Sequence, residues 1–129
     1  MKFTKEEELR LTNHLSSVAE FIRNEIQSRM AGTDITVDFG AMKDYPNFPY
    51  REKEWHLYVS DRDCSIRSGG LGGIPVIPTE PGSEDSRLRY YSLEAGMCLL
   101  REWEHVKSAL LAHIEEIGKE KRLLDTFKI

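Results

Sequence analysis

Apolar residues recur at helical spacing in two long segments of this chain and alternate with polar residues between them. From Phe3 to Met30, and from Leu93 to about Leu124, steps of three and four residues predict amphipathic helices. In the middle, period-two alternation predicts three strands, the last two forming a hairpin, around Ile35–Phe39, Trp55–Val59 and Cys64–Ile66. We therefore expect a single α+β domain, residues 1–129, with two long helices packed on one face of a small antiparallel sheet, in the order α-β-β-β-(β)-α.

Local signals place the ends of both helices. Thr4 followed by Glu7 fits a capping box, in which each side chain accepts a backbone N–H that the helix leaves unpaired. Gly32 suits the end of this helix. Ser92 is the predicted N-cap of the last helix. Trp103 lies on the apolar stripe of that helix, and we expect it to pack on the sheet near Trp55 or Leu57.

Two long connections are the predicted carriers of binding residues. Gly40–Lys53 is rich in aromatics and proline, whereas Ser68–Ser86 is rich in glycine and proline and acidic at its end. Loops of this length in a compact domain are often functional. Arg87–Tyr91, after the second, is a candidate fourth strand. The candidate binding residues are Tyr45, Phe48, Tyr50 and Arg51 in the first connection, and Arg67, Arg87 and Arg89 beside the second.

Composition and charge favour a soluble protein that does not bind nucleic acid. Among 129 residues, 40% are hydrophobic and 31% charged, as in folded globular domains. The 18 basic and 22 acidic residues give a net charge of -4, and no segment is basic enough to predict a phosphate-binding face. No apolar run is long enough for a membrane span, and the acidic start does not fit a signal peptide. Cys64 and Cys98 are expected to be buried thiols, so we predict a cytoplasmic protein.

The residues that invite a catalytic or metal-binding interpretation do not complete a motif. Glu102 and His105 form one Glu-x-x-His pair, whereas a di-iron bundle needs two such pairs and further carboxylates. The glycines of Gly69–Gly73 are not followed by the lysine and helix of a phosphate-binding loop. His113 is expected on a helix surface. The sequence therefore indicates no catalytic residue, metal or cofactor, and it favours a non-enzymatic protein.

We expect an interaction or regulatory module, such as an inhibitor, that binds another protein through its middle loops. Its size, its acidity and the lack of catalytic motifs are compatible with accessory proteins of phages or mobile elements. The apolar residues Leu123, Leu124, Phe127 and Ile129 exceed what a small sheet covers, so we also expect a homodimer with the last helix at its interface. The alternative is a small-molecule or nucleotide-binding protein, which could be an enzyme, using the Gly-rich loop and the nearby arginines.

Overall fold

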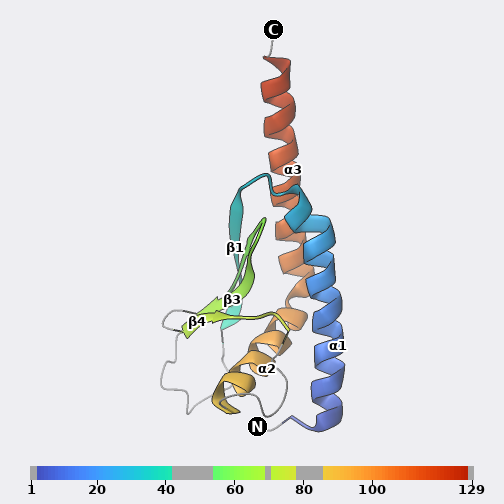
Figure 1. Cartoon of the computed structure of the whole chain (residues 1–129), viewed down its shortest axis with the longest axis vertical. Coiled ribbons are helices and arrows are strands. Elements are labelled where there is room, and N and C mark those ends of the chain that lie inside the picture. Colours follow the sequence, from blue (N-terminus) through green and yellow to red (C-terminus); the bar gives the residue numbers. More distant parts are fainter. Residues whose placement is uncertain (1–2, 42–53, 69–70, 78–85, 128–129) are drawn as a thin grey trace.

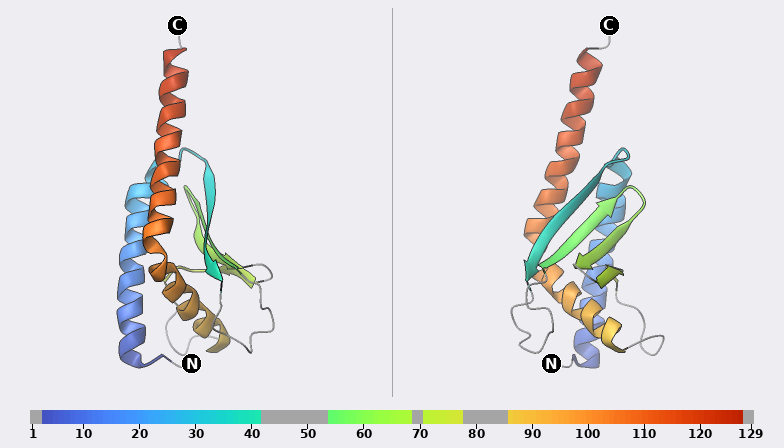
Figure 2. Two further views of the ribbon diagram at one scale, coloured as in Figure 1. Left: turned by 180° about the vertical axis from the view of Figure 1, so that it is seen from behind. Right: turned by 90° about the vertical axis from the view of Figure 1, so that its left-hand side faces the viewer.

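The computed structural model describes residues 3–41, 54–68, 71–77 and 86–127, and it has a layer of helices against one face of a four-stranded antiparallel sheet (Figures 1 and 2). This arrangement confirms the predicted α+β class. The helical elements are α1 (Lys5–Phe21), continued by the short turns η1 (Ile22–Ile26) and η2 (Gln27–Arg29), then α2 (Ser86–Arg101) and α3 (Trp103–Thr126). The strands are β1 (Asp34–Ala41), β2 (Glu54–Ser60), β3 (Cys64–Ser68) and β4 (Leu71–Ile74).

The sheet is an antiparallel meander in the order β1-β2-β3-β4. Its inward face holds the alternate residues that the sequence predicted. Their burial against the helices is the main source of core stability. Gly40 has φ +130° where the β1–β2 register shifts, a backbone angle that suits glycine. The buried inward residues are Val37, Phe39, Trp55, Leu57, Val59, Ile66 and Ile74.

The turn between β2 and β3 is tied to the helical layer by one side chain. Ser60 N–H donates to the Asp63 carbonyl at 2.8 Å, and Asp63 N–H donates back to Ser60 Oγ at 3.0 Å. Gln27 Nε2 then donates to the carbonyls of Ser60 and Asp63, at 3.0 and 3.2 Å. The predicted hairpin is therefore present, and η2 holds its tip.

The N-terminus of α1 is capped as predicted. Glu7 N–H donates to Thr4 Oγ1 at 3.1 Å, and Thr4 N–H donates to Glu7 Oε1 at 3.0 Å. These two bonds satisfy donors that the first helical turn cannot pair internally. At the other end the chain reverses at Ala31 and Gly32, with φ +52° and +77°, which confirms Gly32 as a stop signal.

A π-helical turn, η1, explains how α1 keeps one buried stripe to its end. Val18, Ile22, Ile26 and Met30 are all buried although they follow three successive steps of four residues. In a regular α-helix each such step overshoots a full turn by about 40°. The wider π turn winds more slowly per residue. It therefore returns Ile26 and Met30 to the buried face of the helix.

The prediction of one long last helix with Ser92 as its N-cap is wrong, because the structure has two helices, α2 and α3, in this part of the chain. They are broken at Glu102, which has φ -102° and ψ 14°. Ser92 is not an N-cap: it lies inside α2, where its Oγ is buried without a hydrogen-bond partner. The break lets α2 and α3 run in different directions, with α2 crossing near the lower ends of the strands (Figure 2). α3 then continues through Gly118 without interruption.

The fourth strand exists, but not at the predicted place. β4 lies in the segment predicted as a loop and pairs with β3, bringing Ile74 opposite Ile66. The candidate strand Arg87–Tyr91 is instead part of α2. Glycine weakens strand propensity, so the residues of β4 carry little strand signal of their own, and pairing with β3 decides their conformation.

α1 and α2 approach each other closely at Gly96. A Cβ atom added there would lie 2.5 Å from Leu15 Cδ1, and Leu15 is fully buried. By contrast, the nearest atom to a Cβ added at Gly118 is Arg122 Nη1 at 3.9 Å. The two helical glycines therefore have different roles, and only Gly96 is required by packing.

Gly96→Ala and Gly118→Ala should change stability in opposite directions. Both gain helix propensity of up to ~1 kcal/mol, but Gly96→Ala forces Leu15 to move in a packed core, which costs ~1–3 kcal/mol. We expect urea unfolding to show a less stable Gly96→Ala and a more stable Gly118→Ala. Stabilisation by both substitutions would contradict the close approach of α1 and α2.

The capping box should make stability depend on acid pH. The Thr4 backbone N–H, and next the Thr4 hydroxyl, hold the pKa of Glu7 below its ordinary value of 4.5. The stabilisation is therefore complete above pH 4.5 and is lost as the pH falls through the lowered pKa. We expect Glu7→Ala to lower the melting temperature at pH 7 and to melt with the wild type in strong acid. Glu6→Ala, in the same turn but outside the box, should show a smaller effect at pH 7.

Candidate functional site

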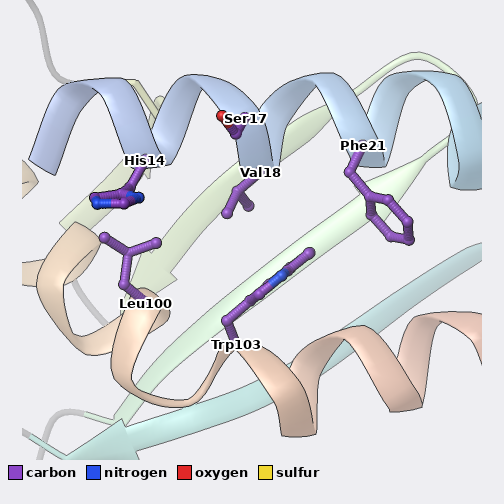
Figure 3. A pocket seen from close by; sticks show the side chains of 6 residues that line it. All are labelled: His14, Ser17, Val18, Phe21, Leu100 and Trp103. Atoms are coloured by element: carbon purple, nitrogen blue, oxygen red, sulfur yellow. The ribbon is translucent and has the colours of Figure 1, made fainter.

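The outer side of the helical layer is hollowed where α1 passes the junction of α2 and α3 (Figure 3). This first hollow has a volume of about 240 Å³. Figure 3 shows side chains of α1 facing Leu100 and Trp103 across it. Val18 is buried at its floor, and Phe21 and Trp103 are half-buried. The lining is therefore apolar except for two α1 side chains. It consists of His14, Ser17, Val18, Phe21, Leu100 and Trp103.

A second hollow adjoins the first along α1 and shares His14 and Leu100 with it. Its volume is about 210 Å³. We call the two together the helix groove. The two hollows adjoin where His14 and Leu100 face each other (Figure 3), and each has polar as well as apolar side chains in its lining. The second hollow is lined by Phe3, Glu7, Arg10, Leu11, His14, Met97 and Leu100.

Aromatic packing fixes one end of the helix groove. The rings of Phe21 and Trp103 meet edge to face, with centroids 5.7 Å apart. Lys107 Nζ lies 5.2 Å from the centroid of the Phe21 ring, within range of a cation–π contact. Trp103 was expected to pack on the sheet; the ring contact that the structure records is with α1 instead.

The C-terminal half of α3 extends beyond both the sheet and α1 (Figures 1 and 2). We call residues 115–127 the α3 projection. Leu123, Leu124 and Phe127 on it have exposed fractions of 58%, 66% and 72%.

His113 of α3 forms a contact with the turn between η2 and β1. Its Nε2 atom and Thr33 Oγ1 are 2.9 Å apart, and Thr33 Oγ1 donates to the Met30 carbonyl. His113 is therefore half-buried and anchors α3 to the start of β1, rather than lying freely on the helix surface.

The outer face of the sheet is polar, and its side chains pair across the strands. His56 Nδ1 is bonded to Asp38 Oδ1, and Tyr58 OH donates to Asp34 Oδ2 at 3.3 Å. The Arg67 guanidinium lies 4.0 Å from the centroid of the Tyr58 ring, and its Nε donates to Ser65 Oγ at 3.1 Å. These contacts explain why the outward positions of β1, β2 and β3 are polar in the alternating sequence pattern.

The structure places only part of the predicted binding set. Tyr45, Phe48, Tyr50 and Arg51 lie outside the described residues. Arg67 is exposed on the outer face of the sheet. The backbones of Arg87 and Arg89 belong to α2, in the helical layer on the opposite face, and the described residues do not include their side-chain surroundings.

The described residues do not assemble a recognisable reactive centre. No group of three or more His, Cys, Asp or Glu side chains in this part of the chain is arranged to hold a metal ion. Glu102 and His105 are both exposed. Cys64 and Cys98 are not joined in a disulfide, and burial raises the pKa of the Cys64 thiol to about 12, so that it stays protonated at neutral pH. No helix among the described residues combines the length and apolar character that crossing a bilayer requires.

No protein-family model, curated protein or solved structure matches this chain. The surfaces of the molecule therefore have to be interpreted from their own geometry and chemistry.

Sequence reasoning missed the helix groove. His14 and Phe21 lie beside the main apolar stripe of α1, and Phe3 precedes the helix, so the apolar periodicity that predicts the helix does not include them. Phe21, an aromatic residue off the main stripe of α1, was the available signal. Apolar residues off the main stripe indicate a second packed face.

Phe21 and Trp103 should stabilise the groove as a pair. Aromatic pairs in this geometry contribute ~0.5–1.5 kcal/mol beyond the burial of each ring. We expect a double-mutant cycle of Phe21→Leu and Trp103→Leu, followed by urea unfolding, to give a coupling free energy in that range. A control cycle of Leu9→Ala and Trp103→Leu should give a coupling near zero, because Leu9 is exposed and does not line the groove. Zero coupling in both cycles would contradict the contact.

Proposed function

We propose that this protein is a non-enzymatic protein-interaction module that self-associates through the α3 projection. The observation that carries the proposal is the exposure of Leu123, Leu124 and Phe127 on a helix that extends past the rest of the fold. Single exposed apolar residues are ordinary. Three large ones within five positions at the end of a projecting helix favour an interface.

The spacing along the projection favours a helix as its partner. Ile117, Leu124 and Phe127 follow steps of seven and three residues, which is the spacing of a seam between paired helices. Ile117 is already half-covered, whereas the later residues are exposed. Fully burying a Leu or Phe side chain is worth ~1.5–3 kcal/mol. Two copies pairing along this seam would bury several such side chains, and two-fold dimers are the commonest assembly.

A regulatory or inhibitory role remains our proposal for the wider function. In this proposal the dimer presents further surfaces to a protein partner. The loop residues Tyr45, Phe48, Tyr50 and Arg51 stay predicted contacts. The alternative, a nucleotide or small-molecule site using Arg67, gains no support from the sheet face, where the guanidinium is already stacked on Tyr58.

Light scattering coupled to size exclusion tests the self-association. At tens of micromolar we expect the wild type to have twice the chain mass of 14.9 kDa. The double variant Leu124→Ser, Phe127→Ser should weaken the dimer by at least about tenfold, because it removes two central apolar anchors. Its far-UV circular dichroism should change little, since both residues are exposed in the monomer.

Leu9→Ser is the matched control. Leu9 is 64% exposed, close to the 66% of Leu124, but it lies on α1 away from the projection. This variant should therefore remain a dimer. A monomeric wild type, or equal weakening by Leu9→Ser, would refute the proposed interface.

A further inference from the structure

The two hollows of the helix groove repeat one pattern along α1. The first is lined from α1 by His14, Ser17, Val18 and Phe21. The second is lined from the same helix by Glu7, Arg10, Leu11 and His14. Each set has the positions i, i+3, i+4 and i+7, and one is the other shifted by seven residues.

Four side chains in this arrangement form the hole that receives one knob in knobs-into-holes helix packing. Two such holes in succession require two knobs seven residues apart, or about 10.5 Å along a helix. A helix lying beside α1 supplies apolar side chains at that interval. A β-strand does not, because residues on one face of a strand are about 6.6 or 13 Å apart.

The sizes of the hollows fit side chains better than a separate small molecule. An apolar cavity of about 150 Å³ holds a benzene molecule. Hollows of about 240 and 210 Å³ therefore each accept one large aliphatic or aromatic side chain. Each alone is below the ~300–1,000 Å³ of most small-ligand sites.

The charge at the Phe21 end of the helix groove indicates the chemistry of the helix that would bind there. Lys107 lies over the Phe21 ring at this end, and the described residues give it no ion-pair partner. At the other end, Arg10 is paired with Glu6 at 3.3 Å, and Glu7 accepts the Thr4 N–H. Lys107 therefore places a positive charge beside the first hollow, where an acidic residue of a ligand would be attracted.

We propose that the helix groove is the docking site for an amphipathic helix of a partner protein, which places two apolar side chains seven residues apart in the two hollows and an acidic residue beside Lys107. This site is separate from the α3 projection and does not rest on the self-association proposed above. Both surfaces belong to one molecule, so a dimer would offer two such grooves.

A designed peptide tests the proposal on the full chain. The probe is a fluorescein-labelled helical peptide of ~20 residues, long enough to hold helical structure, with Leu on its a and d positions and Glu on its flanks. A second peptide has Lys in place of every Glu. By fluorescence anisotropy, we expect the Glu peptide to bind and the Lys peptide to bind at least about fivefold more weakly. Lys107→Glu should reverse this preference.

Ser17→Trp blocks the first hollow, and Ser16→Trp is its matched control. Both serines are exposed on α1, and each hydroxyl donates to the carbonyl four residues earlier. Only Ser17 lines the groove. We expect Ser17→Trp to raise the Kd of the Glu peptide at least about tenfold and Ser16→Trp to leave it within about twofold.

Two tryptophans give an independent readout of where the peptide binds. Trp103 lines the first hollow, whereas Trp55 is fully buried on the inward face of the sheet. In a ¹H–¹⁵N spectrum the indole signal of Trp103 should shift on addition of the Glu peptide, and that of Trp55 should not.

Several results would overturn the proposal. They are no binding of the Glu peptide, equal binding by Ser16→Trp and Ser17→Trp, and an unmoved Trp103 signal. Loss of peptide binding in Leu124→Ser, Phe127→Ser would also overturn it, because the peptide would then bind the α3 projection. None of these results bears on whether the chain is a dimer, which is measured without peptide.

Discussion

The burial of one apolar stripe of α1 in a core that it shares with α2, α3 and the inward face of the sheet is the constraint on which the other features depend. Leu15, Ile22 and Ile26 of the helical stripe are almost fully buried in this core, as are the sheet residues Trp55, Leu57 and Ile66. The π turn η1 exists because the stripe continues in steps of four beyond the length over which a regular α-helix keeps such a face inward. That turn also brings Gln27 to the tip of the β2–β3 hairpin. The Gln27 side chain therefore links the helical layer to the sheet.

The same constraint explains what the sequence could predict. Local signals are enough to predict α1, its capping box and strands β1 to β3. In each of these elements the apolar period and the residues at its ends indicate the same structure. The break at Glu102 and the strand β4 have no comparable signal. α2 and α3 together look like one continuous amphipathic helix, and only the need to cover both the sheet and α1 separates them. In β4, Gly72 and Gly73 disfavour a strand, and pairing with β3 overrides that preference.

The candidate surfaces were harder to predict than the fold for a physical reason. A loop rich in aromatics and glycine is visible in a sequence, whereas the exposure of a helical residue depends on which neighbours cover it. Leu110 and Leu124 stand two full heptads apart on α3, yet one is fully buried and the other 66% exposed. The helix groove depends in addition on where the chain turns at Glu102, since that turn sets Leu100 and Trp103 opposite α1.

The two halves of α3 are stabilised in different ways. Its first half is held by packing, with Val106 and Leu110 fully buried and His113 tied to Thr33. The α3 projection carries exposed ion pairs of Lys119 with Glu115 and Glu116, each worth a few tenths of a kcal/mol. An isolated helix of this length is marginal in water, so its order is propagated from the packed half. Under the proposed self-association, a second copy would supply the packing that the projection lacks. Dimer formation and the stability of these last turns would then be thermodynamically linked.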